Sequence, residues 1–153
     1  MALFGDTTAA FSAGPASGMP FEVDPSGKMG EMRYDGQVAV VTGAGNGLGK
    51  TYALLLGARG AKVVVNDLGG SHIGDGASTA AADVVVDQIK AMGGEAVANY
   101  ESVENGEAII KTAIDTFGRV DILINNAGIL RDVTLQNMTE KDWEMIYKVH
   151  IRG

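Results

Sequence analysis

Three glycines follow directly on a short apolar run at residues 38–42, namely Gly43, Gly47 and Gly49. Glycine lets the backbone turn tightly and approach a pyrophosphate group at the N-terminus of the next helix. The spacing is Gly-x-x-x-Gly-x-Gly rather than Gly-x-Gly-x-x-Gly, and Asn46 within the turn can form local hydrogen bonds. An ordinary strand-to-helix connection is the alternative. The position between a valine-rich segment and an alanine- and leucine-rich segment favours nucleotide binding.

A carboxylate stands at the end of the second apolar run, where a dinucleotide site would need one. Asp67 follows residues 61–66 and lies 18 residues after Gly49. An acid at this place accepts hydrogen bonds from the ribose hydroxyls of adenosine. Its charge would repel a 2′-phosphate, and neither Asn46 nor Leu68 offers a cation to receive one. These residues favour NAD over NADP, and a solvated aspartate at a strand end is the alternative.

Two further turns follow predicted strands and could face the same ligand. Ser102 and Val103 come after the third strand, where an adenine ring would lie. After the fourth strand, the run Asn-Asn-Ala-Gly at residues 125–128 offers amides and small residues beside a cofactor ribose. Asn and Gly are common turn residues, but four such elements in this order favour a cofactor site. The candidate cofactor-binding residues are Gly43, Asn46, Gly47, Leu48, Gly49, Asp67, Leu68, Ser102, Val103, Asn126, Ala127 and Gly128.

Strand and helix patterns alternate from Gln37 onward, and these elements must position the candidate residues. Short valine- and isoleucine-rich runs predict strands covered on both faces, whereas longer amphipathic segments predict helices. The alternation predicts an α/β fold, a Rossmann-type doubly wound parallel sheet with right-handed crossovers and the strand order 3-2-1-4. We expect strands at 38–42, 61–66, 95–99 and 120–125, and helices at 48–59, 79–92, 105–117 and 139–150.

The last predicted strand and helix carry further expectations. Strand 4 would be an edge strand whose apolar residues 122–124 are poorly protected, and such edges promote pairing with other chains. Because a nucleotide-binding fold of this kind continues beyond strand 4, the sequence is interpreted as the N-terminal portion of a larger domain. The final helix opens with Thr139 and Asp142 at capping-box spacing. Its buried stripe is expected to consist of Trp143, Ile146 and Tyr147.

Composition and charge exclude several classes of function. The formal net charge of −7 argues against a nucleic-acid footprint and against binding to an anionic membrane surface. Cysteine is absent, so disulfide and thiolate chemistry are excluded, and the isolated His72 and His150 cannot form a zinc cluster alone. No apolar run approaches the ~20 residues of a membrane-spanning helix. We therefore expect no metal site, no nucleic-acid partner and no membrane span.

Residues 1–32 differ in composition from the rest of the chain. Segment 1–20 is rich in Ala, Ser, Gly and Thr, and Asp6 is its only charged side chain. It lacks the basic start and apolar centre of a signal peptide. Its small apolar surface cannot offset the entropy of ordering, so a flexible extension is expected, with a docking role as the alternative. The predicted division is therefore between this extension and a domain at residues 33–153.

The motifs together resemble a known enzyme family. The glycine turn at residues 42–49 and the Asn-Asn-Ala-Gly run are similar to those of the short-chain dehydrogenase/reductase family. Other segments resemble the (3R)-hydroxyacyl-CoA dehydrogenase units of type 2 peroxisomal multifunctional enzymes, also called type 4 17-beta-hydroxysteroid dehydrogenases. These segments are residues 65–70, 96–100, 126–132 and 149–153, and the likeness extends from about residue 33 to residue 153.

This resemblance implies a substrate, a cofactor and a partner. Such enzymes oxidise a (3R)-hydroxyacyl-CoA to the 3-ketoacyl-CoA in fatty-acid β-oxidation, use NAD and form homodimers. Placement in the peroxisome follows from the resemblance alone, with cytoplasm and mitochondrion as alternatives. The cofactor contacts of the family carry over to Gly43, Asn46, Leu48, Gly49, Asp67, Ser102, Val103 and Asn126.

The catalytic tyrosine and lysine of the family do not carry over. In that family the tyrosine removes the hydroxyl proton while hydride leaves for the nicotinamide, and the lysine lowers the pKa of the tyrosine. None of the four tyrosines of this chain has a lysine four residues later. We therefore expect the parent protein to be an NAD-dependent oxidoreductase and this chain alone to be an inactive fragment. The alternative is a non-catalytic nucleotide-binding or assembly subunit.

Two positions depart from the pattern of the wider family. His150 stands where many short-chain dehydrogenases have a catalytic asparagine, and the multifunctional subgroup resembles this chain in having histidine there. His150 either relays protons or caps a helix, and both interpretations stay open. The loop at residues 71–76 differs from the subgroup pattern, as a tolerant surface loop can.

Overall fold

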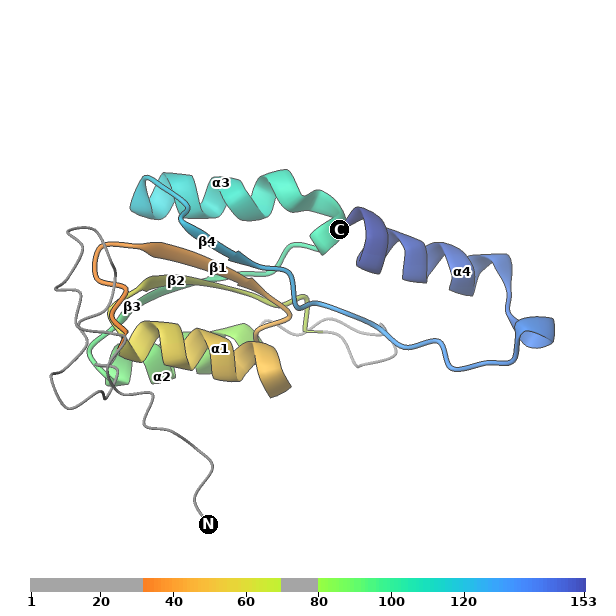
Figure 1. Ribbon diagram of the computed structural model, residues 1–153, viewed down its shortest axis with the longest axis horizontal. Helices are drawn as coiled ribbons and strands as arrows, with labels where there is room; N and C mark the ends of the chain where they lie inside the picture. Colours follow the sequence, from red (N-terminus) through yellow and green to blue (C-terminus); the bar gives the residue numbers. More distant parts are fainter. Residues whose placement is uncertain (1–31, 70–79) are drawn as a thin grey trace, which may run out of the picture. The chain divides into compact units, whose positions relative to one another are not determined.

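Four parallel strands form a sheet in the order β3-β2-β1-β4, as the sequence predicts (Figure 1). The structure, a computed structural model, describes residues 32–69 and 80–153. The predicted extension, apart from its last residue, and the loop at 71–76 lie outside the described residues. The strands are β1 (Val38–Thr42), β2 (Lys62–Asn66), β3 (Glu95–Asn99) and β4 (Ile122–Ile124).

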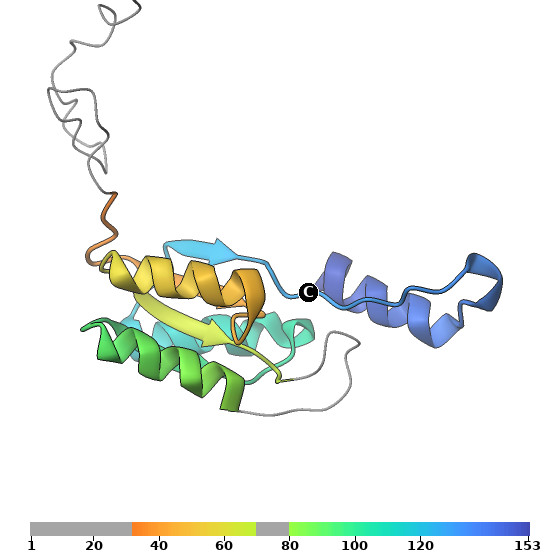
Figure 2. The ribbon, with the colours of Figure 1, turned by 90° about the horizontal axis from the view of Figure 1, so that it is seen from below.

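Helices cover both faces of this sheet, which confirms the doubly wound architecture. Figure 2 shows α1 and α2 side by side over one face, and Figure 1 shows α3 over the other. These helices are α1 (Gly47–Ala58), α2 (Ala80–Ala91) and α3 (Gly106–Phe117). A layer of helix on each face requires strands that are apolar on both sides, and the sequence of β1 meets this requirement.

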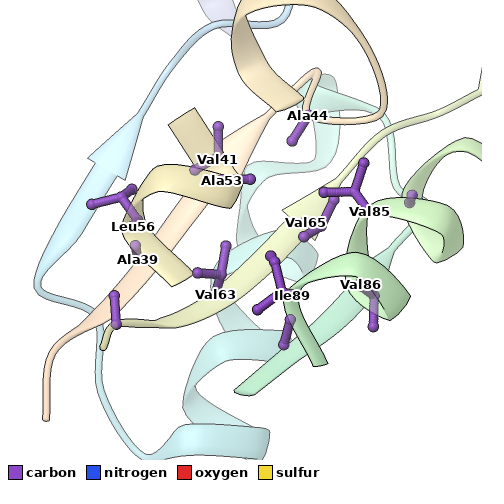
Figure 3. Packing of buried hydrophobic residues seen from close by; sticks show 13 residues of the cluster. Ala39, Val41, Ala44, Ala53, Leu56, Val63, Val65, Val85, Val86 and Ile89 are labelled. Atoms are coloured by element: carbon purple, nitrogen blue, oxygen red, sulfur yellow. The ribbon is translucent and has the colours of Figure 1, made fainter. Parts of the chain in front are cut away.

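The apolar core lies in two layers, one on each side of the sheet. Alternate residues of β1 point to opposite faces, as the pleat of a strand requires, and all five are buried. Val41 contributes to the cluster beneath α1 and α2, together with Ile89 of α2 (Figure 3). Val40 contributes to the cluster beneath α3, together with Ile109. Burial of these side chains is the main source of stability for the sheet.

The strand register brings the carboxyl ends of three strands level with one another. Thr42 of β1 lies opposite Asn66 of β2, and Asn66 lies opposite Asn99 of β3. Two backbone bonds extend this alignment past the strands, from Ala44 N to the Asn66 oxygen at 2.9 Å and from Asp67 N to the Asn99 oxygen at 3.0 Å. The turns predicted to hold a ligand therefore begin at one edge of the sheet.

Several element boundaries differ from the predicted ones by a few residues. Helix α3 is preceded by a single 3-10 turn, η1 (Val103–Asn105), and is capped by Gly118, whose φ of 82° is left-handed. The fourth strand is shorter than the predicted 120–125. Its pairing with β1 begins at Ile122. Asp121, just before it, bonds Val38 twice, from its own amide to the Val38 oxygen at 2.9 Å and through its carboxylate to the Val38 amide at 2.8 Å.

The C-terminal helix confirms one prediction and contradicts another. Helix α4 (Glu140–Tyr147) follows the 3-10 turn η2 (Leu135–Asn137) and begins with the predicted capping box of Thr139 and Asp142. The predicted buried stripe is wrong, because Trp143 is 62% exposed and Tyr147 is 52% exposed. Apolar spacing marks a face that can be covered, and within the described residues nothing covers this one.

Beyond α4 the chain continues through a π-helical turn, η3 (Lys148–Arg152). This turn lies against η1, with Gly153 next to Val103. Across the described ranges 32–69 and 80–153, every helix is too short or too polar to cross a membrane.

Candidate nucleotide-binding site

A cleft of about 580 Å³ opens at the carboxyl ends of the strands. In open α/β sheets, ligands bind at this edge, where the strand order reverses between neighbours of the first strand. The order 3-2-1-4 places that reversal between β1 and β4. The cleft is lined by Gly43, Asn46, Gly47, Asn66, Asp67, Leu68, Gly69, Ala81, Glu101, Ser102, Val103, Asn126, Ala127, Gly128, Ile129 and Val149.

The turn after β1 is held by a side chain from the turn after β4. The Nδ2 of Asn126 donates to the carbonyl oxygens of Thr42 at 2.9 Å and Gly43 at 3.1 Å. In return, the Thr42 hydroxyl oxygen accepts from the amides of Asn126 and Ala127, both at 3.0 Å. Thr42 is 5% exposed, so these exchanges are shielded from water. The two turns therefore form one rigid unit.

Close packing inside this unit requires glycine at two positions. Gly43 has a left-handed φ of 62°, and a Cβ there would lie 2.8 Å from the Ala127 Cα. A Cβ on Gly49 would lie 2.5 Å from the Asn126 Nδ2 and still closer to the Gly43 oxygen. Both separations are well inside van der Waals contact, so any larger residue would push the turn and α1 apart.

The N-terminus of α1 lies at the cleft, and its first backbone amides have no partner among the described residues. Asn46, the residue before the helix, has an extended backbone and makes no capping bond with its side chain among the described residues. The first turn of α1 carries no acidic residue. Gly47 lines the cleft, and a Cβ on it would enter open space. Helix N-termini of this kind attract anions, because their amides lack partners and the helix dipole is positive there.

The Asp67 carboxylate is oriented by two backbone amides. Its Oδ2 accepts from the Gly45 amide and its Oδ1 from the Gly69 amide, both at 2.7 Å. The side chain is half-buried and lines the cleft. Each carboxylate oxygen can accept a second hydrogen bond, so the group remains able to bind hydroxyls of a ligand.

A buried amide network at the ends of β2 and β3 was missed by the sequence analysis. Asn66 and Asn99 are 1% and 6% exposed, and the Nδ2 of Asn66 donates to the Asn99 Oδ1 at 2.8 Å. The same Nδ2 donates to the carbonyl oxygen of Glu101 at 2.8 Å. Two buried asparagines at equivalent positions of adjacent strands are the signal that could have identified this network. The network fixes the Glu101 end of the loop that carries Ser102.

His150 reaches the turn after β4 from the π-helical turn. Its Nε2 lies 3.0 Å from the amide of Ile129 and 2.9 Å from the carbonyl oxygen of the same residue, and the ring tautomer decides which bond forms. A Cβ on Gly128 would lie 2.8 Å from the imidazole, so the ring packs directly on this turn. His150 therefore has a structural role of its own at the cleft rim, and proton relay stays a hypothesis.

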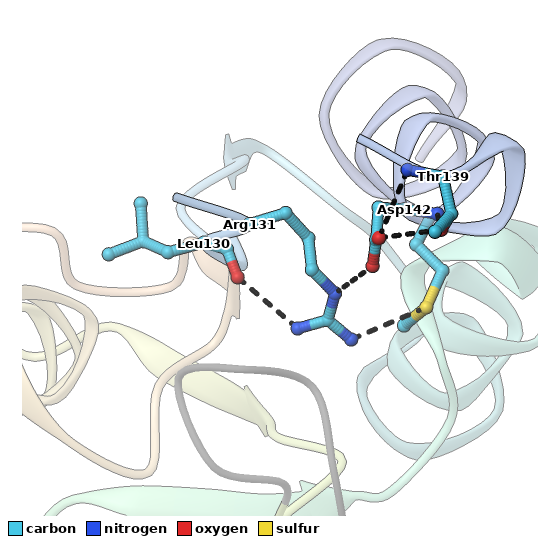
Figure 4. A network of polar contacts seen from close by, with 5 residues as sticks. Leu130, Arg131, Thr139 and Asp142 are labelled. Atoms are coloured by element: carbon cyan, nitrogen blue, oxygen red, sulfur yellow. Dashed lines mark hydrogen bonds and ion pairs between the residues drawn. The ribbon is translucent and has the colours of Figure 1, made fainter. Parts of the chain in front are cut away.

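An arginine connects the segment after β4 to the start of α4 (Figure 4). Arg131 Nε lies 3.1 Å from the Asp142 Oδ1, and its NH2 contacts the Met145 sulfur at 3.4 Å. The Thr139 hydroxyl donates to the Asp142 carboxylate at 2.6 Å. This hydrogen bond, with a smaller contribution from the Arg131 charge, holds the pKa of the Asp142 carboxyl below its ordinary value.

The structure brings most of the predicted site residues together, but two lie outside the cleft. Leu48 is 67% exposed on α1, and Gly49 packs behind the turn rather than facing the opening. In the described part of the chain, no three acidic, histidine or cysteine side chains converge as a metal site would require. The candidate residues that line the cleft are Gly43, Asn46, Gly47, Asp67, Leu68, Ser102, Val103, Asn126, Ala127 and Gly128.

Comparison with known proteins identifies the family. The family model for short chain dehydrogenases matches residues 37–153, which include all four strands and every residue lining the cleft. The chain belongs to the short-chain dehydrogenase family. A short chain dehydrogenase from Mycobacterium avium is 47% identical in sequence and has the same fold, with a TM-score of 0.69. The match covers 77% of this chain and 43% of that one.

Two curated relatives are similar to this chain over most of its length. The peroxisomal hydratase-dehydrogenase-epimerase of Neurospora crassa is 68% identical over 123 residues, which are 80% of this chain and 14% of that protein. Peroxisomal multifunctional enzyme type 2 of Drosophila melanogaster is 65% identical over 124 residues, or 81% of this chain and 21% of that protein. The chain therefore spans about a fifth or less of the length of these relatives.

A further solved structure with a similar fold contains a nicotinamide cofactor. It is a 7 alpha-hydroxysteroid dehydrogenase complexed with NADH and 7-oxo glycochenodeoxycholic acid. The two chains are 35% identical and superpose with a TM-score of 0.68, over 78% of this chain and 44% of that one.

Proposed function

We propose that this chain is the NAD-binding part of a dehydrogenase that oxidises (3R)-hydroxyacyl-CoA to 3-ketoacyl-CoA. The observation that carries the proposal is the cleft at the strand ends, where the α1 N-terminus and the Asp67 carboxylate are both available to one ligand. A dinucleotide presents a pyrophosphate and a ribose diol at a fixed separation, and these two features of the site suit those two groups. The 7 alpha-hydroxysteroid dehydrogenase with bound NADH supports nicotinamide as the reactive group.

Different residues of the chain would contact different groups of the cofactor. The amides at the start of α1 would bind the pyrophosphate, with Gly47 leaving room for it. Asp67 would accept the hydroxyls of the adenosine ribose, and Ser102 and Val103 would border the base. Asn126 would act from behind, because both hydrogens of its amide nitrogen are used by the Thr42 and Gly43 carbonyls. Bound NAD would supply the hydride acceptor.

The preference for NAD follows from charge at the ribose end. A 2′-phosphate would approach the Asp67 carboxylate, and Leu68, the next residue, offers no cation to receive it. Like charges at such a separation repel by several kcal/mol unless a cation intervenes. We infer that NADP binds more weakly than NAD.

Substrate, location and partner are inferred from the relatives. The peroxisomal hydratase-dehydrogenase-epimerase of Neurospora crassa and the peroxisomal multifunctional enzyme type 2 of Drosophila melanogaster are 68% and 65% identical to this chain over the matched residues. We infer from these names and from the sequence resemblance that the parent protein acts on acyl-CoA in fatty-acid β-oxidation in the peroxisome as a homodimer. These 153 residues contain no tyrosine followed by lysine four residues later, so by themselves they lack the proton acceptor of this chemistry. We infer that the chain alone does not reduce NAD.

A non-catalytic binding or assembly subunit is the second candidate function. It is favoured by the apolar side chains of α4, since Trp143 and Tyr147 are both more than half exposed. A helix with such a face would be covered on association. The two candidates differ in whether the intact parent protein turns over a 3-hydroxyacyl-CoA. Purified parent protein that binds NAD without any turnover would favour the assembly role.

The experiment that tests cofactor binding is a nuclear magnetic resonance titration of the 153-residue chain with NAD and with NADP. We expect NAD to bind with a dissociation constant of about 1 mM, roughly 4 kcal/mol, since the nicotinamide-side tyrosine and lysine are not within the chain. NADP should bind at least about tenfold more weakly. Asp67→Ser should abolish this difference, whereas Asp87→Ser, which removes an exposed carboxylate on α2, should preserve it. No binding of either dinucleotide would contradict the proposal.

A further inference from the structure

In the buried amide network beside the cleft, each hydrogen bond has a defined donor and acceptor. The Thr112 hydroxyl donates to the carbonyl oxygen of Ala108 at 3.1 Å, so its oxygen accepts from the Asn99 Nδ2 at 2.9 Å. The Asn99 Oδ1 in turn accepts from the Glu101 amide at 3.0 Å. A backbone N–H and a hydroxyl that is already committed thus determine which end of the Asn99 side chain is oxygen.

The orientation of Asn99 determines the orientation of Asn66. The two groups that face the Asn66 amide nitrogen are both acceptors, the Asn99 Oδ1 and the Glu101 carbonyl oxygen, each at 2.8 Å. A rotated Asn66 amide would place oxygen against oxygen at both contacts, which is strongly unfavourable. The nitrogen therefore points into the network, and the Asn66 Oδ1 is left on the other side.

This oxygen is an acceptor without a donor. Within the described residues, no group donates a hydrogen bond to the Asn66 Oδ1. The residue as a whole is only 1% exposed, but its unpaired Oδ1 keeps a small opening to solvent. Asn66 also lines the cleft. A buried polar atom normally has a partner, so an oriented and unpaired acceptor at a cleft wall indicates a partner on the ligand.

We propose that the Asn66 Oδ1 accepts a hydrogen bond from the 6-amino group of the adenine base. This inference rests on the proposed dinucleotide-binding function and adds the group that selects the base. Asn99 and Thr112 are positioning residues, because they fix the Asn66 amide without touching the ligand. A purine with oxygen at position 6, such as hypoxanthine or guanine, would present an acceptor to an acceptor and be rejected.

The position of Asn66 in the fold identifies the base rather than the ribose as its partner. Asn66 is on the same face of β2 as Val64, toward α3 and the Glu101 loop, whereas Asp67 faces the glycine turn through the Gly45 amide. The amino group is the only N–H donor on the adenine ring system of a dinucleotide. Ser102 cannot make the same distinction, because a hydroxyl rotates and can donate to an oxygen as readily as it accepts from an amine.

The test compares NAD with nicotinamide hypoxanthine dinucleotide, which carries oxygen in place of the 6-amino group. Both would be titrated into the 153-residue chain, and the ratio of their dissociation constants is the readout. We expect NAD to bind about tenfold more tightly to the unaltered chain. Asn66→Ala should bring the ratio close to one. Thr112→Val keeps the side-chain size but removes the hydroxyl that orients Asn99, and it should reduce the ratio severalfold.

Thr116→Val is the matched control, since Thr116 is exposed one turn further along α3. It should leave the ratio unchanged. If Asn66→Ala does not fold, Thr112→Val alone carries the test, because a purely structural role would weaken both dinucleotides equally. A ratio near one in the unaltered chain, or a tenfold ratio that persists in folded Asn66→Ala or Thr112→Val, would overturn the inference while leaving NAD binding intact. Failure of both dinucleotides to bind would overturn the proposed function as well.

Discussion

The side-chain amide of Asn126 donates a hydrogen bond to the carbonyl oxygen of Gly43 over 3.1 Å, although 83 residues separate the two in the chain. This contact joins the turn after β1 to the turn after β4. It lies directly behind the N-terminus of α1, where a Cβ on Gly49 would collide with the same amide nitrogen. The shape of the anion-binding turn is therefore set by a tertiary contact as well as by its glycines.

The first prediction concerns the space behind this turn. Gly49→Ala should destabilise the chain by about 1–3 kcal/mol, because the new methyl group overlaps the Gly43 oxygen and the Asn126 amide. Gly106→Ala is the matched control, since Gly106 has helical dihedrals at the start of α3 with nothing within 4 Å of its Cβ position. That change should stabilise by about 0.4–1 kcal/mol. Urea unfolding measures both, and equal effects would refute the packing argument.

The second prediction concerns the buried hydroxyl of Thr42, which accepts from the Asn126 and Ala127 amides. Thr42→Val keeps the shape of the side chain but leaves two partly buried amides without this acceptor, and we expect a loss of about 1–3 kcal/mol. Thr42→Ser should lose less than half as much unfolding free energy as Thr42→Val, because the oxygen is kept. The control is Thr51→Val, whose exposed hydroxyl bonds Gly47. An unfolding midpoint for Thr42→Val equal to that of Thr51→Val would contradict the prediction.

The third prediction concerns pH and the start of α4. The Thr139 hydroxyl, and to a smaller extent Arg131, hold the pKa of the Asp142 carboxyl below its ordinary value of 3.8. A depressed pKa in the folded state means that the carboxylate stabilises the capping box above pH 3.8. This contribution is lost as the pH falls through the lower folded-state value. Hydrogen exchange of the Trp143 amide, which bonds the Thr139 oxygen, should show protection falling in that window.

Asp142→Asn provides the control for this pH dependence, because asparagine does not titrate. In that variant the protection of the Trp143 amide relative to the Gly118 amide, which closes α3, should be the same on both sides of pH 3.8. Asp121 also has a carboxyl pKa lowered by Arg119 and by the Val38 amide, so acid should weaken the start of β1 as well. The comparison with Gly118 separates that general loss from the local one. If the Trp143 amide of Asp142→Asn still lost protection below pH 3.8, the loss would have to come from a group other than Asp142.

The fourth prediction concerns the edge of the sheet. Leu123 of β4 is 50% exposed, and β4 pairs with β1 on one side only among the described residues. An exposed apolar edge strand tends to pair with another chain, so we expect the 153-residue chain to self-associate as its concentration rises. Leu123→Lys should suppress this association in sedimentation experiments. Leu55→Lys makes the same substitution at a 46% exposed position on α1, away from the sheet edge, and should leave the self-association nearly unchanged.

Much of the fold could be predicted because the signals were local. The valine-rich run of β1 is buried on both faces, as its composition indicates. The strand order of the sheet and its parallel pairing followed from the alternation of strands with helices. The capping box at Thr139 was predicted from two residues three apart and is present. Ten of the candidate cofactor residues line one cleft because each follows the carboxyl end of a strand.

The remainder depended on contacts between distant residues. The stripe containing Trp143 was predicted to be buried from spacing alone, but spacing does not show whether another element covers it. Asn66 and Asn99 each end a predicted strand, but they become partners only when β2 and β3 align, so neither segment taken alone marks the pair. His150 was left between proton relay and capping. Its contact with Ile129 shows what holds the ring, and the relay remains to be tested in the intact parent protein.

The two amide bonds to Asp67 limit how the coenzyme preference of this protein could be redesigned. Gly45 and Gly69 each lose an acceptor if the side chain is removed, so a simple truncation would loosen the glycine turn while it removes the repelling charge. A short neutral acceptor such as serine at position 67 would better preserve the turn, with an arginine introduced at position 68 to receive a 2′-phosphate. Electrostatic selectivity and the geometry of the turn are therefore encoded in one side chain and would have to be separated by a pair of substitutions.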